Sequence, residues 1–358
     1  MEFLRCTPSV FVIGDEYEIL VNATENGIFS IRVGEITYYE ENSGVLSSEK
    51  NFAKIRVPQR ELDRWGGYTV TYRLTIKRRS YYSELSEPFE AYFEFKPLVK
   101  KEGINLYLIS DVHYHFDVAE SACGFFGDDV DVFVVNGDIG EVRSEENYFE
   151  VCRFVGNISG GRIPVIFVRG NHDARGRLAE RFTDYFPCES KNTYYTFSLG
   201  NLCGVAIDCG EDKPDSQVEY GGVNRFEAFR RRETEFLKKV TLDESKIRFA
   251  VSHICPAQAI EEAGCIFDIE RDVYTEWNRE LSRMGISFML CGHIHKAYIL
   301  EKNDKASLLP HDYSVVVGGA TEGAENIVGS AITLYSDSMT VRFTDKDKTI
   351  RKEMTVEY

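Results

Sequence analysis

From residue 104 onward, short apolar segments alternate with stretches of helical periodicity, and no other feature of the chain constrains its fold as strongly. Residues 225–240 and 269–284 have helical spacing, with Phe226 and Phe229 on one stripe. Apolar segments that alternate with helices are typical of the strands of a layered α/β domain. These segments span residues 104–109, 130–135, 164–168, 202–207, 247–251 and 286–290, and further strands are expected within residues 314–343.

Residues 1–98 follow a different pattern, in which apolar and polar side chains alternate with a period of two, most clearly over residues 68–77 and 89–95. This pattern predicts a small all-β sandwich of the immunoglobulin or fibronectin kind, and the alternative is a β extension of the larger domain. Pro97 and nearby charges end the pattern, so we expect a sandwich domain over residues 1–98, a linker over 99–103 and an α/β domain over 104–358. Turn signals within the first region are Asn26-Gly27, Asn42-Ser43-Gly44 and Trp65-Gly66-Gly67.

Five of the apolar segments run directly into polar side chains of the kinds that bind metal ions or take part in catalysis. In α/β sheets the carboxyl ends of the strands border the ligand crevice, so we expect these side chains to converge. Glycines beside them permit sharp turns and a close approach of the backbone. The five stretches are Ser110-Asp111-Val112-His113, Asn136-Gly137-Asp138, Arg169-Gly170-Asn171-His172-Asp173, Ser252-His253 and Cys291-Gly292-His293-Ile294-His295.

The residue types at these strand ends fit a metal centre. Carboxylate, amide and imidazole donors suit Mn, Fe or Zn better than a metal that prefers thiolates. Taken singly, each has a structural interpretation, since an Asp at a strand end often caps a helix and His253 alone would be a core histidine. Five of the 7 histidines nevertheless fall at these strand ends, which favours a ligand role for the set. The donors are too many for one tetrahedral site, so the sequence predicts two metal ions that share a bridging carboxylate.

The ordered motifs resemble those of the calcineurin-like metallophosphoesterases over about residues 104–335. The resemblance implies a four-layer fold, a two-sheet β-sandwich flanked by helices, with a dinuclear metal centre at the strand ends. His172 would donate a proton or hydrogen bond to the phosphate or the leaving oxygen, and Asp173 would orient its ring. The resemblance also implies that one metal is held by Asp111, His113, Asp138 and His295, and the second by Asp138, Asn171, His253 and His293.

The β region before the catalytic part resembles the arrangement of purple-acid-phosphatase-like proteins, but two positions depart from that group. His113 stands where the group has no histidine, and Glu141 stands where it has a metal-binding tyrosine, so we do not expect a tyrosinate–iron enzyme. Arg169 matches an arginine of the Ser/Thr phosphatases and would clamp a phosphate, and the alternative is a surface arginine. His115 is a second candidate for substrate binding, and the alternative is an exposed side chain without a role.

Two divalent ions about 3.5–4 Å apart would lower the pKa of a bridging water and neutralise the phosphoryl oxygens. The resulting hydroxide would attack phosphorus in line while His172 assists the leaving oxygen, so no nucleophilic Ser or Cys is needed. Cys255 and Cys291 are accordingly expected to be core thiols. We therefore predict a metal-dependent phosphoric ester hydrolase that acts on a small phosphomonoester or phosphodiester. The alternative is a binding or scaffold protein with an inactive phosphoesterase-like domain, which would be expected to lack some of the ligands.

The composition narrows the substrate and the partners. The 358 residues carry 42 Lys and Arg against 58 Asp and Glu, a net charge of −16. Nucleic-acid affinity rests on basic residues, so this balance disfavours nucleic acids and leaves a small phosphoester. The nearly neutral N-terminal region would bind a protein or a glycan, or would only pack against the catalytic part. Nine cysteines without a Cys-x-x-Cys pair, no signal-like N-terminus and no apolar run of membrane length predict a cytoplasmic protein without a membrane anchor.

Overall fold

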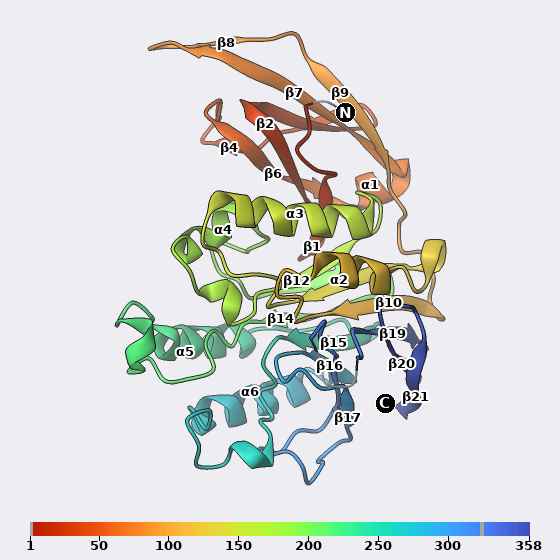
Figure 1. The fold of residues 1–358 in the computed structure, drawn as a ribbon. Helices are drawn as coiled ribbons and strands as arrows, with labels where there is room; N and C mark the ends of the chain where they lie inside the picture. Colours follow the sequence, from red (N-terminus) through yellow and green to blue (C-terminus); the bar gives the residue numbers. More distant parts are fainter. Residues whose placement is uncertain (1–2, 323–325) are drawn as a thin grey trace.

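The protein is built around two β-sheets that pack face to face, with helices on both outer faces (Figure 1). The structure, a computed structural model, describes residues 3–322 and 326–358. Within these residues, thirteen strands form the first sheet and six form the second. This architecture confirms the predicted mixed α/β class.

The strands of the first sheet are β1 (Ser9–Ile13), β2 (Glu16–Val33), β3 (Ile36–Tyr38), β6 (Lys50–Pro58), β7 (Gly67–Arg78), β8 (Ser83–Leu85), β9 (Phe89–Glu94), β10 (Ile104–Ile109), β11 (Val132–Asn136), β12 (Val165–Val168), β19 (Gly329–Leu334), β20 (Ser338–Thr344) and β21 (Ile350–Glu357). Those of the second sheet are β13 (Tyr195–Leu199), β14 (Leu202–Ile207), β15 (Ile247–Ser252), β16 (Phe288–Cys291), β17 (Tyr298–Leu300) and β18 (Ser314–Val317). A separate hairpin consists of β4 (Glu41–Asn42) and β5 (Val45–Leu46). The α-helices are α1 (Gln59–Trp65), α2 (Phe116–Cys123), α3 (Glu145–Ser159), α4 (Phe182–Tyr185), α5 (Phe226–Leu237) and α6 (Arg271–Arg283).

The central strands of each sheet run parallel, namely β10, β11 and β12 in the first sheet and β14, β15, β16 and β18 in the second. A strand buried on both faces needs apolar side chains on both, which is why each was predicted from a continuous apolar run. The carboxyl ends of parallel neighbours lie at the same edge of a sheet. The polar side chains that follow these strands therefore lie close to one another at that edge.

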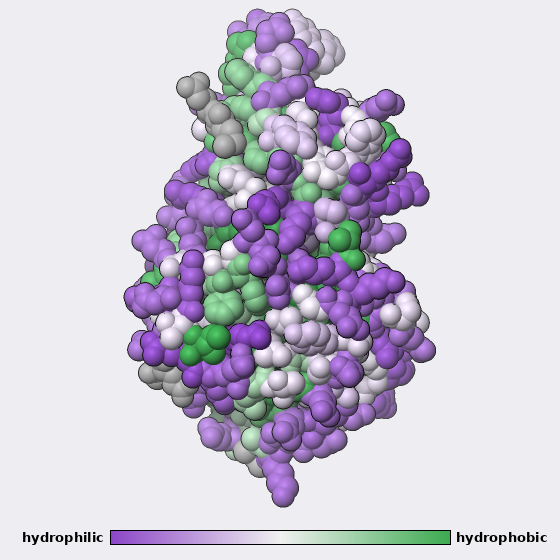
Figure 2. Space-filling model, turned by 90° about the vertical axis from the view of Figure 1, so that its right-hand side faces the viewer, coloured by the Kyte–Doolittle hydropathy of each residue, from purple (hydrophilic) through white to green (hydrophobic). Residues whose placement is uncertain are grey.

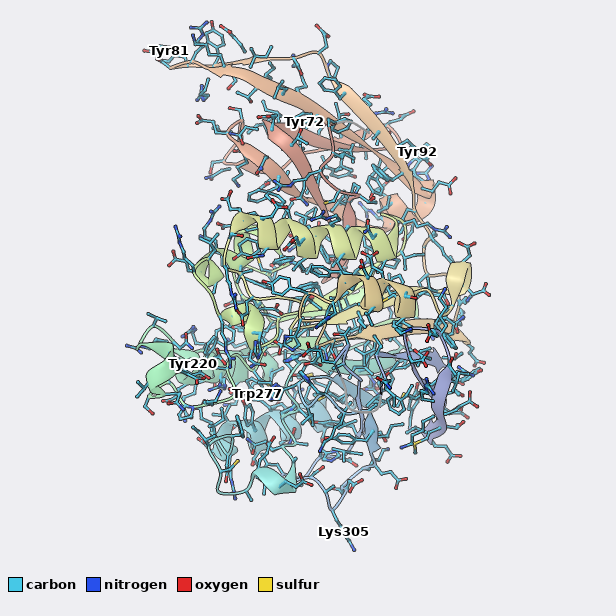
Figure 3. All side chains as sticks on the ribbon, viewed as in Figure 1. Tyr72, Tyr81, Tyr92, Tyr220, Trp277 and Lys305 are labelled. Atoms are coloured by element: carbon cyan, nitrogen blue, oxygen red, sulfur yellow. The ribbon has the colours of Figure 1, made fainter. Side chains whose placement is uncertain are left out.

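Alternate side chains of each strand enter different cores, and this produces the layers. Leu106 and Leu108 of β10 belong to the core between the two sheets. Tyr107 and Ile109 point to the other face, into a core shared with α2 and α3. The outer face of the second sheet packs against α5 and α6, where Trp277 is fully buried (Figure 3). Helix, sheet, sheet and helix thus follow one another through the molecule.

The N-terminal region is rich in strands, as predicted, and its first strand lies inside the large sheet. Strand β1 pairs in parallel with β12 through Phe11 and Val165, and it pairs antiparallel with β2 on its other side. The sheet therefore continues by hydrogen bonds from β12 through β1 and β2 to β7. The domain boundary at residues 99–103 stays a prediction.

Of the three turn predictions in this region, one differs from the structure. Asn26-Gly27 is not a turn, because β2 continues through it with a register irregularity between Asn22 and Gly27. At Gly27 the strand approaches β7 so closely that a Cβ would collide with the ring of Tyr72. The turn predicted at residues 65–67 is confirmed, since Gly66 connects α1 to β7 with a positive φ, but the alternation did not predict helix α1 before it. The turn predicted at residues 42–44 is confirmed as the β4–β5 connection.

The surface seen in Figure 2 is mainly hydrophilic, with apolar residues gathered in small separate patches. Away from the catalytic part, β7 and β8 form a projecting hairpin, with Tyr81 at its tip 96% exposed (Figures 1 and 3). None of the helices in the described residues is both long enough and apolar enough to cross a membrane. A role of this region in binding a protein or glycan stays a prediction.

Candidate metal centre

The loops that follow β10, β11, β12, β15 and β16 meet at the carboxyl edge of the two sheets. Backbone hydrogen bonds join the first two loops, since Asp111 N–H donates to Gly137 O at 3.0 Å and His113 N–H donates to Asp138 O at 3.0 Å. The loop after β16 is tied to the same place, because His293 N–H donates to Asp111 Oδ2 at 3.0 Å. Side chains from both sheets are thereby held together.

The backbone of these loops is strained at the side chains that were predicted as ligands. A positive φ is costly for a residue with a Cβ, and such residues cluster at functional sites. Gly137 marks the closest approach of two loops, because a Cβ there would lie 2.5 Å from the backbone nitrogen of Gly170. The predicted ligands with positive φ are Asp111, His113, Asp138, His293 and His295.

A first group of donors consists of Asp111, His113 and His295, whose ligand atoms lie within 4.8 Å of one another. Asp111 is fully buried, and its Oδ1 lies 3.4 Å from His295 Nε2. The Nε2 atoms of His113 and His295 are 3.2 Å apart. Two imidazole nitrogens and a carboxylate that face one point form a donor set for a divalent metal ion.

A second group consists of Asp138, His253 and His293. Asp138 Oδ2 lies 3.1 Å from His253 Nε2 and 4.0 Å from His113 Nε2, so one carboxylate oxygen faces both groups. Asn171 Oδ1 lies 3.1 Å from His293 Nδ1, which places this amide beside the second group. The structure thus brings together all of the side chains that were predicted as ligands.

The ring of His253 is fixed by a hydrogen bond and by charge. Its Nδ1 lies 2.7 Å from the carbonyl oxygen of Asn136, so the ring proton is held there and Nε2 faces the carboxylates. Burial alone would lower the pKa of His253, but the charges of Asp138 and Asp111 outweigh it and raise this pKa to about 10. Burial and the neighbouring charge of His253 lower the pKa of His293 to about 4. The cluster is therefore a concentration of negative charge that draws in positive charge.

The donor set fits divalent ions of the Mn, Fe or Zn kind. The facing Nε2 atoms of His113 and His295 can share a cation through their lone pairs, whereas two protonated rings would repel each other. Asp111 and Asp138 are buried, and buried carboxylates require cationic or hydrogen-bonded partners. Oxygen and imidazole ligands are those that these metals accept.

His172 lies partly exposed at the margin of the cluster, with Nε2 4.0 Å from Asp138 Oδ2 and Nδ1 3.7 Å from Glu141 Oε1. The carboxylate of Asp173 is turned to the backbone instead of to this ring. It accepts hydrogen bonds from the backbone N–H groups of Asp138 at 2.9 Å and Gly170 at 2.8 Å. Burial, reinforced by the charge of Asp138, raises the pKa of Asp173 to about 7. Asp173 thus joins the loops after β11 and β12.

The two candidate substrate-binding residues have different surroundings. Arg169 Nη2 lies 2.8 Å from Asp208 Oδ2, and its guanidinium lies over the ring of Phe226. Only 12% of its side chain is exposed, so it is not a surface arginine. His115 is exposed, and its Nε2 lies 2.6 Å from Glu322 Oε1. Their roles towards a substrate stay predictions.

Sequence reasoning missed an ion pair next to His172. Arg175 Nε and Nη2 donate to the two carboxylate oxygens of Glu211 at 2.8 and 2.7 Å. Arg175 Nη1 lies 3.3 Å from His172 Nε2, so the guanidinium borders the cluster. A signal was present, because the apolar run 202–207 also ends in acidic residues, Asp208 and Glu211.

The cysteines beside the ligands belong to the core, as expected. Cys291 is fully buried in the core beneath the second sheet, and Cys255 packs against that core. All nine cysteines are free thiols. Their closeness to His253 and His293 follows from the strands that carry them.

Comparisons with known proteins agree with this site. The sequence model for calcineurin-like phosphoesterases matches residues 104–297, just over half of the chain. The fold is similar to that of purple acid phosphatase PPD1 from yellow lupin (Lupinus luteus) seeds, with a TM-score of 0.61 and 10% identity over 98% of this chain and 74% of that chain. It is also similar to that of PhoD, with a TM-score of 0.56 and 10% identity over 99% of this chain and 89% of that chain. A search of curated proteins found no match.

The two-sheet fold and the cluster of ligands define a metal-dependent phosphoric ester hydrolase. The chain belongs to the calcineurin-like phosphoesterase family. Because the two structural similarities extend over nearly the whole chain, they include the N-terminal β region.

Proposed function

We propose that the protein hydrolyses a small phosphomonoester or phosphodiester with the help of two divalent metal ions. The observation that carries this proposal is the position of Asp138, whose Oδ2 lies 3.1 Å from His253 Nε2 in one donor group and 4.0 Å from His113 Nε2 in the other. When bound, the ions would supply Lewis-acid polarisation of the phosphoryl oxygens and a water of lowered pKa. One would be held by Asp111, His113, Asp138 and His295, and the other by Asp138, Asn171, His253 and His293.

Side chains around the metal cluster would assist the leaving oxygen, bind the phosphoryl group and hold the ligand loops in place. His172 Nε2 lies at the margin, where it would donate a hydrogen bond or proton to the leaving oxygen. Arg175 brings a permanent positive charge to the same margin, where its guanidinium would bind a phosphoryl oxygen. Asp173 holds the loops of Asp138 and Asn171 in register through its hydrogen bonds to the backbone.

The net charge of −16 supports a small substrate. A long polyanion would meet a mainly acidic surface, whereas a single phosphoester needs only the local positive charge of the metal centre. Mn, Fe and Zn all suit the donor set, so the metal must be identified by analysis of the purified protein.

The test joins metal content to hydrolysis. Purified protein is analysed for bound metal and assayed with 4-nitrophenyl phosphate and bis(4-nitrophenyl) phosphate in the presence of Mn²⁺. We expect two metal ions per chain and hydrolysis of at least one ester. Asp138→Asn and His253→Ala should lose metal and lower kcat/KM by at least about a hundredfold, because each removes a ligand of the centre. Asp128→Asn, whose side chain is 93% exposed, is the matched control.

The outcomes distinguish an active phosphoesterase from an inactive phosphoesterase-like binding protein. No metal uptake, or hydrolysis that survives in both ligand variants, would overturn the proposed function. Metal uptake without hydrolysis of either ester would favour the alternative of an inactive phosphoesterase-like domain that serves in binding. The ratio of monoester to diester kcat/KM then assigns the substrate class.

A further inference from the structure

A large pocket opens directly beside the metal centre. Its volume is about 690 Å³, and it is lined by the segment after His172 and by the segment that precedes α5. Arg175 connects the pocket to the margin of the metal centre, because it lines the pocket while its Nη1 lies 3.3 Å from His172 Nε2. Pockets of about 300–1,000 Å³ accept whole organic ligands, so this one offers more room than a phosphate group needs. The organic part of the substrate would lie here.

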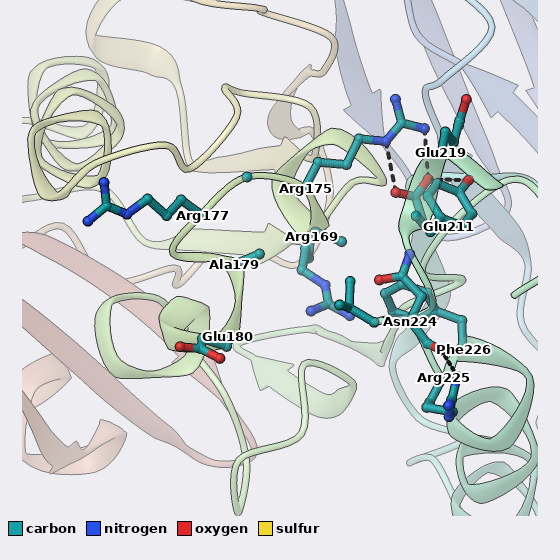
Figure 4. A pocket seen from close by; sticks show the side chains of 14 residues that line it. Arg169, Arg175, Arg177, Ala179, Glu180, Glu211, Glu219, Asn224, Arg225 and Phe226 are labelled. Carbon is teal, nitrogen blue, oxygen red and sulfur yellow. Dashed lines mark hydrogen bonds and ion pairs between the residues drawn. The ribbon is translucent and has the colours of Figure 1, made fainter. Parts of the chain in front are cut away.

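The inner wall of this pocket is rigid and its charges are paired. Arg169 is bound to Asp208 and packed on Phe226. Arg175 donates two hydrogen bonds to Glu211 (Figure 4). Tyr220, another wall residue, donates its hydroxyl to Glu211 Oε2 at 3.0 Å. These contacts fix the shape of the wall and leave it with little net charge.

Two further arginines stand on opposite rims of the pocket. Arg177 follows the His172 segment and Arg225 precedes α5, and Figure 4 shows them on different sides of the view. Within residues 3–322 and 326–358 no carboxylate forms an ion pair with either of them, and Arg225 donates only to the backbone carbonyls of Gly222 and Asn224. Both side chains are exposed. The rim thus carries two arginines and one exposed glutamate, Glu180, that form no ion pairs, a net positive charge on a chain whose net charge is −16.

Solvated arginines are common on protein surfaces. Arg177 and Arg225 differ from most of them because they line a pocket that Arg175 connects to His172 at the margin of the metal centre. A ligand that places its scissile phosphate at the centre would therefore extend towards them. Guanidinium groups bind carboxylates and phosphates through paired hydrogen bonds, which makes a second anionic group the complementary feature of such a ligand.

We infer that the substrate is a phosphoester that carries a second anionic group, a carboxylate or phosphate, which Arg177 or Arg225 binds at the pocket rim. This inference rests on the proposed function and adds the substrate class to it. Binding energy from a group remote from the reacting phosphate would raise kcat/KM, through kcat as well as KM.

Matched substrates test this inference. Phosphate release by the Mn²⁺-loaded full-length protein is measured for glycerol 3-phosphate against 3-phosphoglycerate, for fructose 6-phosphate against fructose 1,6-bisphosphate, and for adenosine 3′-phosphate against adenosine 3′,5′-bisphosphate. In each pair the second member adds one anionic group. We expect its kcat/KM to be at least about tenfold higher in one pair or more.

The variant Arg177→Gln/Arg225→Gln should reduce that ratio by about five- to tenfold. The control Arg60→Gln/Arg279→Gln removes the same charge from exposed positions outside the pocket and should leave the ratio as in the wild type. Thermal melting of each variant verifies that it is folded.

The results test the second anionic group separately from the proposed phosphoesterase function. Metal-dependent hydrolysis with ratios near one in all three pairs, or a ratio that the rim variant does not change, would overturn this inference and leave the proposed function standing. Absence of hydrolysis in every pair and of both nitrophenyl esters would overturn the proposed function, and the inference with it.

Discussion

Arg175 and Glu211 form a two-point ion pair, in which Nε and Nη2 of the guanidinium donate to the two carboxylate oxygens at 2.8 and 2.7 Å. Glu211 is fully buried, so its position is set by the wall of the pocket rather than by solvent. The pair consequently fixes where the remaining nitrogen of Arg175 lies, 3.3 Å from His172 Nε2. Glu211, which follows β14, thus fixes the position of the positive charge of Arg175 beside His172, which follows β12.

Glu211→Gln should therefore lower kcat for an aryl phosphate by about ten- to hundredfold, because a displaced positioning group costs this much in rate. Arg175 would turn towards Asp212, whose Oδ1 already lies 3.6 Å from Nη2. Steady-state kinetics measure the effect, and metal content should stay at the wild-type value. Glu145→Gln removes the carboxylate partner of Arg181, an ion pair at exposed positions, and serves as the control. An unchanged kcat in Glu211→Gln would show that Arg175 needs no positioning.

Much of the fold could be predicted because the central strands are buried on both faces. Residues 104–109 and 202–207 were expected as strands and coincide with β10 and β14. The pairing of β1 with β12 could not be read in the same way, since it joins residues more than 150 positions apart and leaves no local pattern. Helix α1 was missed because the surrounding alternation masks its short span.

The candidate metal ligands could also be predicted from the sequence, because they directly follow the predicted strands. Ligand types at the ends of strands reveal a metal centre because parallel strands carry them to one edge. The contacts of Asp173 were not predictable, since only the folded loops show that its carboxylate meets three backbone N–H groups rather than the His172 ring. The pairing of Arg175 with Glu211 likewise depends on tertiary structure, and each residue alone is an ordinary charge.

Gly137→Ala should destabilise the protein far more than Gly103→Ala, although both glycines have positive φ, 75° and 64°. At Gly103 no atom would lie within 4 Å of the new Cβ, whereas at Gly137 it would lie 2.5 Å from Gly170 N and 2.8 Å from His253 Nδ1. We expect a loss of about 1–2 kcal/mol at position 103 from the backbone conformation alone. At position 137 we expect about 3–5 kcal/mol. Urea unfolding measures both, and equal losses would mean that the loops separate without cost.

Glu233→Gln should stabilise the protein increasingly as the pH rises. Burial, followed by the charge of Asp208, raises the pKa of Glu233 well above its usual value, and its Oε2 has no hydrogen-bond partner among the described residues. Because the folded pKa exceeds the unfolded value of about 4.3, stability is full below that pH and is lost as the pH rises through the folded pKa. Glutamine keeps the acceptor for Asp208 N–H at 2.9 Å and carries no charge.

Thermal melting between pH 4.5 and 8 measures this effect. The difference in Tm between Glu233→Gln and the wild type should be near zero at the acidic end and reach about 2–4 °C at the alkaline end, as about 1 kcal/mol does in domains of 150–250 residues. Glu235→Gln, on the exposed face of the same helix, should show no such trend. A Glu233→Gln variant that melts lower than the wild type at every pH would mean that the carboxylate is charged and stabilising.

Strand β1 makes the catalytic sheet depend on the N-terminal region. Phe11 is 1% exposed, packs edge-on against Phe167 at 5.8 Å between ring centroids, and lies in the strand that covers the edge of β12. Phe11→Ala should therefore cost about 3–5 kcal/mol in urea unfolding, whereas Tyr81→Ala at the exposed hairpin tip should stay within about 0.5 kcal/mol of the wild type. Residues 99–358 produced alone would expose the edge of β12 and should aggregate in size-exclusion chromatography. A monomeric, fully stable 99–358 fragment would instead establish residues 99–103 as a true domain boundary and would reduce β1 to an added strand.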